Sequence, residues 1–95
     1  MLGFKFLKVK GISMYPLIPE HSYILVYEFC KFFIQEKKIF IFQHKNLGLL
    51  VKKLTKIDNE ENLWFESLNE NGLSTSQIGP INKKDLVGIV LHIIK

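Results

Sequence analysis

Residues 49–68, LLVKKLTKIDNEENLWFESL, contain the pattern that decides the fold of this chain. Two apolar runs, Leu49–Ile57 and Leu63–Leu68, are separated by the short charged segment Asp58–Asn62. Branched and aromatic side chains in runs of this length favour β-strands, and a short polar turn between two such runs is typical of a β-hairpin. We therefore expect an antiparallel strand pair over these residues.

Similar apolar runs on both sides of this hairpin are expected to complete a sheet. Further strands are expected at Phe4–Val9, Tyr23–Tyr27, Lys38–Gln43 and Leu86–Ile94, and loops or turns at Ile12–Pro19, His44–Gly48 and Asn69–Pro80. No segment shows an amphipathic 3.6-residue period with helix caps. The predicted fold class is all-β, a small and mostly antiparallel domain of roughly six or seven strands.

The composition is that of a small folded protein. The chain has 95 residues, of which 47% are hydrophobic and 13% aromatic, and a net charge of +4. This is enough for one modest core, so we expect a single domain over residues 1–95. All thirteen basic residues are lysines. Because nucleic-acid binders usually rely on arginine for bidentate contacts, a nucleic-acid partner is not expected.

The sequence shows no segment that would cross or enter a membrane. No apolar run approaches the roughly 18 residues of a transmembrane helix, and lysines interrupt the N-terminal region where a signal peptide would be apolar. We therefore expect a soluble, cytoplasmic protein. Association with a membrane surface through Phe29, Phe32, Phe33 and Ile34 is an alternative, although a core role for these side chains is favoured. Cys30 is the only cysteine, which excludes an intrachain disulfide.

Residues 11–16, Gly-Ile-Ser-Met-Tyr-Pro, have the features that a serine nucleophile requires. Such a serine stands on a tight turn whose backbone N–H groups can stabilise an oxyanion. Gly11 can adopt a backbone conformation closed to other residues, and Pro16 restricts the turn from the other side. Met14, directly after the serine, would anchor the turn in the core. These features make Ser13 a candidate nucleophile.

A serine can be activated by a neutral lysine, and residues 50–55 contain a candidate. Side chains alternate along a strand, so Lys52 shares its face with Leu50 and Leu54, whereas Lys53 points to the other face. Burial on an apolar face lowers the pKa of a lysine and favours the neutral amine that can accept a proton. Lys52 is therefore the better candidate for a general base.

Local chemistry alone leaves other interpretations open. Ser13 could be an ordinary loop serine, and the two lysines could extend to solvent from an edge strand. A Ser-His-acid triad would need one of His21, His44 and His92, and none of them has a clear acidic partner in the sequence pattern.

Taken together, these segments resemble the serine–lysine peptidases of the S24 and S26 superfamily, which includes signal peptidase I and LexA-like proteins. The matching segments, in family order, are residues 9–16, 23–26, 38–42, 50–54 and 85–90. The first segment looks like the Gly-x-Ser-Met-x-Pro nucleophile box, and the fourth looks like the box whose first lysine is the base. The resemblance implies a coiled, barrel-like β-sheet and a peptidase with a Ser13–Lys52 dyad that needs no metal or cofactor.

The resemblance also implies roles for residues around the dyad. Backbone N–H groups near Ser13, supported by Met14, would form the oxyanion hole. Ser74, with Ser76 as second choice, would help to position the lysine. The residues that would contact a protein or peptide substrate bound in extended form are Gly11, Ile12 and Tyr15.

The chain departs from the family pattern at three places. His21-Ser22 and Lys37-Lys38 stand where the family usually has Gly-Asp. The late box, normally Gly-Asp-Asn followed by Ser-x-Asp-Ser-Arg, is reduced to Leu68-Asn69 and residues 74–77, without its Asp and Arg. A catalytically weakened peptide-binding module on the same fold is therefore an alternative function.

Within the superfamily, the chain looks most like the short soluble peptidases of nickel-type superoxide dismutase maturation. These remove a short N-terminal propeptide. The sequence has no Ala-Gly or Cys-Gly bond of the kind that LexA-like repressors cleave in themselves. The implied function is limited proteolysis of a propeptide or leader peptide, and a signal peptidase lacking its membrane anchor is the alternative.

Overall fold

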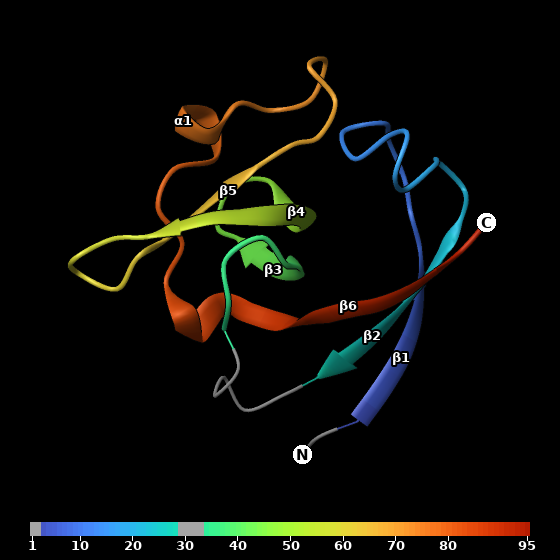
Figure 1. The fold of residues 1–95 in the computed structure, drawn as a ribbon, viewed down its shortest axis with the longest axis horizontal. Coiled ribbons are helices and arrows are strands. Elements are labelled where there is room, and N and C mark those ends of the chain that lie inside the picture. The colour runs from blue at the N-terminus through green and yellow to red at the C-terminus, as the bar shows by residue number, and fades with distance from the viewer. Residues whose placement is uncertain (1–2, 29–33) are drawn as a thin grey trace.

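The computed structural model describes residues 3–28 and 34–95, which form one antiparallel sheet of six strands. The strands are β1 (Gly3–Lys8), β2 (Tyr23–Glu28), β3 (Ile39–His44), β4 (Gly48–Ile57), β5 (Leu63–Glu66) and β6 (Leu86–Ile94). Their order across the sheet is β1-β2-β6-β3-β4-β5 (Figure 1). The predicted all-β class is confirmed, and each expected strand run overlaps one of these strands.

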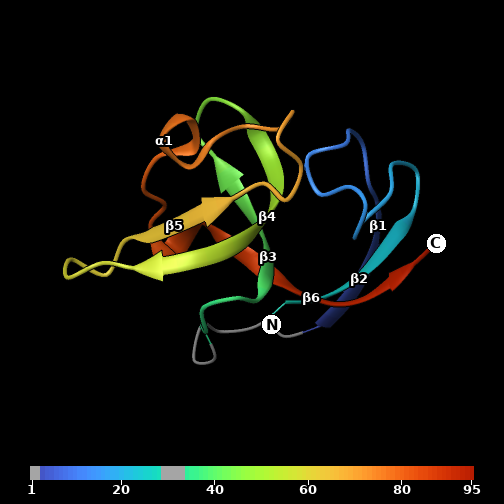
Figure 2. The ribbon, with the colours of Figure 1, turned by 45° about the horizontal axis from the view of Figure 1, so that its top comes forward.

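The sheet is strongly curved, and β6 connects its two halves (Figure 2). Two apolar clusters fill the fold. The first is built on the buried rings of Phe40, Phe42 and Phe65, and the second includes Met14 and Ile24. Burial of these side chains provides the main favourable free energy of folding. Because Met14 belongs to the second cluster, the residue after Ser13 is held by the core itself.

Side-chain alternation on β4 divides its residues between the two clusters. Leu54 is buried in the first cluster, Leu50 packs against the same cluster, and Val51 packs against the second. Lys52 stands between Leu50 and Leu54 along β4 and pairs with Phe40 of β3. The face predicted for Lys52 from alternation is therefore the face it occupies.

The predicted hairpin is present, with β4 and β5 paired antiparallel from Lys53–Glu66 to Ile57–Leu63. Asp58 organises its turn. One carboxylate oxygen accepts hydrogen bonds from the backbone N–H groups of Glu60 and Asn62, and the other accepts from the indole of Trp64. These hydrogen bonds hold the pKa of Asp58 below its ordinary value, and the hydrogen bond from Trp64 has the largest effect.

The expectation of a continuous loop over residues 69–80 is wrong in one respect. Within this range, residues Thr75–Ile78 form a single helical turn, α1. Beyond it, residues Lys83–Asp85 form a 3₁₀ turn, η1. A capping box starts α1, in which the Ser74 hydroxyl accepts from the Gln77 backbone and the Gln77 side chain accepts from the Ser74 backbone. Four residues are too few to show helical periodicity. Neither helix in the described part of the chain is long and apolar enough to cross a bilayer.

Two of the departures from the family pattern coincide with unusual backbone conformations. His21 and Lys37 have φ angles of 71° and 73°, in the left-handed region that favours glycine. Each stands where the resembling family has glycine. Both positions therefore carry a side chain in a backbone conformation that glycine adopts more easily.

We expect a glycine at position 37 to be tolerated far better than one at position 38. Lys37→Gly relieves left-handed strain, which offsets the entropy cost of glycine, so the free energy of unfolding should change by less than about 0.5 kcal/mol. Lys38→Gly, the matched control without a positive φ, should lower it by about 1 kcal/mol. Urea denaturation of both variants measures the difference. Equal losses would contradict the assignment of strain to Lys37.

Candidate active site

Ser13 lies in a turn that the core and one glycine hold in place. Gly11 enters the turn with a φ of 85°, which confirms the conformational role expected of it. The Tyr15 N–H donates to the Ile12 carbonyl at 3.0 Å and closes the turn around Ser13. Met14 is only 2% exposed and anchors the turn, as predicted. The serine is thereby held on a short, well-supported loop between β1 and β2.

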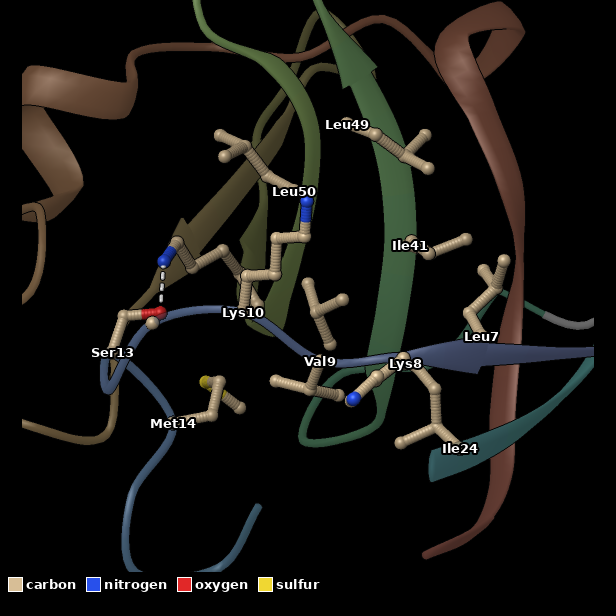
Figure 3. Close-up of a pocket in the computed structure, with 13 residues that line it drawn as sticks. Leu7, Lys8, Val9, Lys10, Ser13, Met14, Ile24, Ile41, Leu49 and Leu50 are labelled. Atoms are coloured by element: carbon tan, nitrogen blue, oxygen red, sulfur yellow. Dashed lines mark hydrogen bonds between the residues drawn. The ribbon is translucent and has the colours of Figure 1, made fainter. Parts of the chain in front are cut away.

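The side chain of Lys52 reaches this turn from β4. Its Nζ donates a hydrogen bond to Ser13 Oγ at 2.5 Å, marked by the dashed line in Figure 3. The two residues are 39 positions apart in the sequence. The curved sheet therefore brings together the two residues that the sequence singled out.

Burial sets the protonation preference of this amine. Lys52 is 3% exposed, and desolvation lowers its pKa from the ordinary value of 10.5. Within the described residues it forms no ion pair that would oppose this effect. A larger fraction of neutral amine is thus present near neutral pH than for a lysine in water. A neutral amine can accept the proton of the serine hydroxyl.

The segment after β5 packs against the serine turn. The Asn69 N–H donates to the Ser13 carbonyl at 2.8 Å. A Cβ atom at Gly72 would lie 2.7 Å from the Cβ of Ser13 and 2.7 Å from Ser67 Oγ, so only glycine fits there. Sequence reasoning missed both contacts, although the Asn71-Gly72 dipeptide is a recognisable turn signal. Asn69 and Gly72 therefore help to hold the serine turn in position.

Two hollows meet where Ser13 and Lys52 lie side by side. The first, of about 220 Å³, has a mainly apolar lining in which Leu7, Ile24 and Ile41 take part (Figure 3). The second, of about 410 Å³, lies on the side of Asn71 and Gly72. Ser13 and Lys52 line both. A chain passing from one hollow to the other would therefore cross the serine hydroxyl.

The residues expected to contact substrate are distributed unevenly around the serine. Gly11 lines both hollows, and Ile12, 44% exposed, lines the second. Tyr15 is 50% exposed and lines neither; its carbonyl accepts a hydrogen bond from the Asn69 side chain at 3.4 Å. Their role in binding stays a prediction.

The structure does not show the expected support for the lysine from Ser74. The Ser74 hydroxyl accepts from the Gln77 N–H at 3.2 Å and lies 3.2 Å from the hydroxyl of Ser76. It belongs to the cap of α1, and in the described part of the chain it makes no hydrogen bond to Lys52. A supporting role for Ser74 or Ser76 thus stays a prediction without a contact behind it.

Among the described residues, no hydrogen bond joins Ser13 to His21, His44 or His92, the three histidines of the triad alternative. His44 is buried, and its Nδ1 accepts from the N–H groups of Asn46 and Leu47, so its Nε2 carries the proton and donates to the Ile78 carbonyl at 2.9 Å. This ring joins β3 to α1 and has no link to Ser13.

The residues suggested for membrane contact are only partly described. Phe29, Phe32 and Phe33 lie outside the described residues. Ile34 is partly buried and packs against the first apolar cluster. For Ile34, the favoured core role is therefore the one observed.

A comparison with protein-family models matches residues 3–91 to the family described as Peptidase S24-like. The chain belongs to this family. The match extends from β1 into β6 and includes both Ser13 and Lys52. Membership supports a peptidase-type function in general. A search of the curated proteins found no match.

We expect Gly72→Ala to disturb the packing behind Ser13. The added methyl group would meet two side chains at sub-contact distance, so the free energy of unfolding should fall by about 2 kcal/mol. Gly3→Ala is the matched control, because its Cβ would be 3.8 Å from the nearest atom and its φ is not positive. Its effect should be within about 0.5 kcal/mol by urea denaturation. Equal stability of both variants would contradict the close approach at Gly72.

Replacing the buried amine should stabilise the fold at neutral pH. Below pH 10.5 the unfolded chain carries a protonated Lys52, whereas the folded chain disfavours that charge. Lys52→Met removes this cost, so we expect a gain of about 1 kcal/mol. The gain should be largest below the lowered folded-state pKa and shrink as pH rises towards 10.5. Urea denaturation at several pH values, with Lys53→Met as control, measures it, and a gain that grew with pH would contradict the account.

Proposed function

We propose that the protein is a serine endopeptidase in which Ser13 is the nucleophile and Lys52 the general base. The observation that supports this most strongly is the 2.5 Å contact between the serine hydroxyl and an amine that burial disfavours in its charged form. Membership of the Peptidase S24-like family supports the same reaction class. An ordinary loop serine does not require a buried amine beside it. A lysine that extends to solvent from an edge strand does not require a contact with a serine hydroxyl.

In the proposed mechanism, neutral Lys52 accepts the proton of Ser13 as Oγ attacks the carbonyl carbon of the scissile peptide bond. The resulting ammonium group then donates this proton to the leaving amine, and an ester remains on Ser13. Lys52, neutral again, accepts a proton from the water that attacks the ester, and returns it to Ser13 Oγ as the acyl group leaves. Serine and lysine are both restored, and one water is consumed.

Backbone N–H groups of the serine turn are proposed to stabilise the oxyanion. Among the described residues, the N–H groups of Ser13 and Met14 have no hydrogen-bond acceptor. The neighbouring N–H of Gly11 is occupied by the Glu20 carboxylate at 3.0 Å. The two free donors can therefore point at developing charge, a contribution of about 3 kcal/mol per donor in other acyl-transfer sites.

The sheet offers a place for a substrate in extended form. Strand β5 pairs with β4 only from Lys53 onward, so the other half of β4, Gly48–Lys52, pairs with β3 alone. This half lines the first hollow, together with the end of β1. An extended peptide could add to this open edge by backbone hydrogen bonds, which would place a carbonyl carbon beside Ser13.

A short N-terminal propeptide or leader peptide of another protein is the proposed substrate. The support for this finer assignment is the resemblance of the nucleophile and lysine boxes to the short maturation peptidases. An open strand edge beside the serine suits an extended terminal segment, because such a segment can pair without prior unfolding of its own protein.

A catalytically weakened peptide-binding module is a second candidate, favoured by one observation. The Ser74 hydroxyl, to which the resemblance assigns support of the lysine, is engaged by Gln77 and Ser76 instead. In that case the hollows would bind an extended peptide without cleaving it. Labelling of the serine distinguishes this candidate from the peptidase.

We expect Ser13→Ala to abolish the cleavage of a pool of internally quenched peptides. Lys52→Met should reduce the rate of this cleavage by about 10²- to 10⁴-fold. The control is Lys53→Met, which removes the neighbouring lysine from the opposite face and should leave cleavage within about twofold, a surface-type effect. A fluorophosphonate should label Ser13, and peptide mapping locates the labelled residue. The extent of labelling should fall across the variants in the same order as cleavage. A folded wild-type protein that neither cleaves nor becomes labelled would favour the binding module.

The pH dependence of labelling provides an independent check. Because the neutral amine is the active form, the rate should rise with pH through the lowered pKa of Lys52 and level off below pH 10.5. Lys52→Met should lose this rise. A rate that falls with increasing pH would contradict a lysine base.

A further inference from the structure

Two lysines line the first hollow in addition to Lys52. Lys8 ends β1 and Lys10 follows two residues later, and both side chains are exposed. In the view of Figure 3 the Lys10 side chain points towards Leu50, which also lines the hollow. The thirteen lining residues include no carboxylate. This site therefore combines an apolar interior with a positively charged rim.

The charges on this rim are not neutralised by the protein. Elsewhere, Lys5 pairs with Glu28 at 2.8 Å and Lys83 with Glu61 at 2.7 Å. Among the described residues, neither Lys8 nor Lys10 forms an ion pair. The nearby Glu20 carboxylate accepts a hydrogen bond from the Gly11 N–H. Two amines at the rim are thus available to an anionic group that arrives with the substrate.

We propose that the first hollow selects peptides in which an acidic side chain lies next to the apolar residue held in the hollow, close to the scissile bond. This inference rests on the proposed peptidase function and adds a substrate class to it. The apolar lining receives one side chain, and Lys10, assisted by Lys8, pairs with the carboxylate. Lys10 has the larger share because its side chain points towards Leu50, another lining residue of the hollow.

The expected size of the effect follows from the exposure of the lysines. Exposed ion pairs each contribute modestly, so two of them should favour an acidic peptide over its neutral counterpart by about fivefold. Salt screens such pairs, because the Debye length falls from about 8 Å at 0.15 M to about 3 Å at 1 M. The preference should therefore nearly vanish at 1 M NaCl.

The test uses fluorescent octapeptides built from alanine, valine and serine, with Glu or Gln placed at one position at a time. Binding to Ser13→Ala is measured by fluorescence anisotropy, and cleavage by the wild-type protein is measured on the same peptides. Glu should be preferred about fivefold at one or two positions. The preference should be lost in a Lys8→Gln, Lys10→Gln double variant and mostly lost in Lys10→Gln alone.

Lys84→Gln is the matched control, because Lys84 is an exposed lysine of η1 that does not line the hollow. It removes the same charge and should retain the preference. Equal binding of Glu and Gln peptides, no binding of either, or loss of the preference in Lys84→Gln as well would overturn the inference. None of these results decides whether the protein is a peptidase, because Ser13 labelling tests that proposal separately.

Discussion

The site depends on a primary amine held inside a β-sheet, where water cannot stabilise its charge. Lys52 shares its strand face with Leu50 and Leu54, and its Nζ is directed at Ser13 Oγ. Burial lowers the pKa of the amine, and the lowered pKa is what suits it to accept a proton. The same burial costs folding free energy, so the feature that supports chemistry opposes stability. The remainder of the fold offsets that cost through its two apolar clusters.

Contacts on three sides hold Ser13 in position beside Lys52. Met14 holds the serine turn in the second apolar cluster, and Asn69 donates to the Ser13 carbonyl at 2.8 Å. Gly72 allows the segment after β5 to lie directly against Ser13. The turn, strand β4 and this segment are far apart in the sequence, and the curvature of one sheet brings them together. The two hollows beside the serine follow from the same arrangement.

Most of the sheet, and the choice of Lys52 over Lys53, could be predicted because both depend on a local pattern, the two-residue alternation of strands. The contacts of Asn69 and Gly72 with Ser13 could not, because they join residues more than fifty positions apart and leave no periodic signal. The capping box at Ser74 was visible in the sequence, but one helical turn is too short to show a period. The Ser74 hydroxyl, which was expected beside Lys52, caps α1 in the structure.

The pKa of Lys52 in the folded protein decides whether this amine can act as a base. NMR titration of protein labelled with ¹³C at the lysine Cε, with the Lys52 resonance assigned by its absence in Lys52→Met, measures it without any substrate. The account predicts a midpoint clearly below the ordinary value of 10.5, with the Cε shift of a neutral amine above that midpoint. A midpoint at or above 10.5 would contradict the account, because a charged Lys52 cannot accept the Ser13 proton.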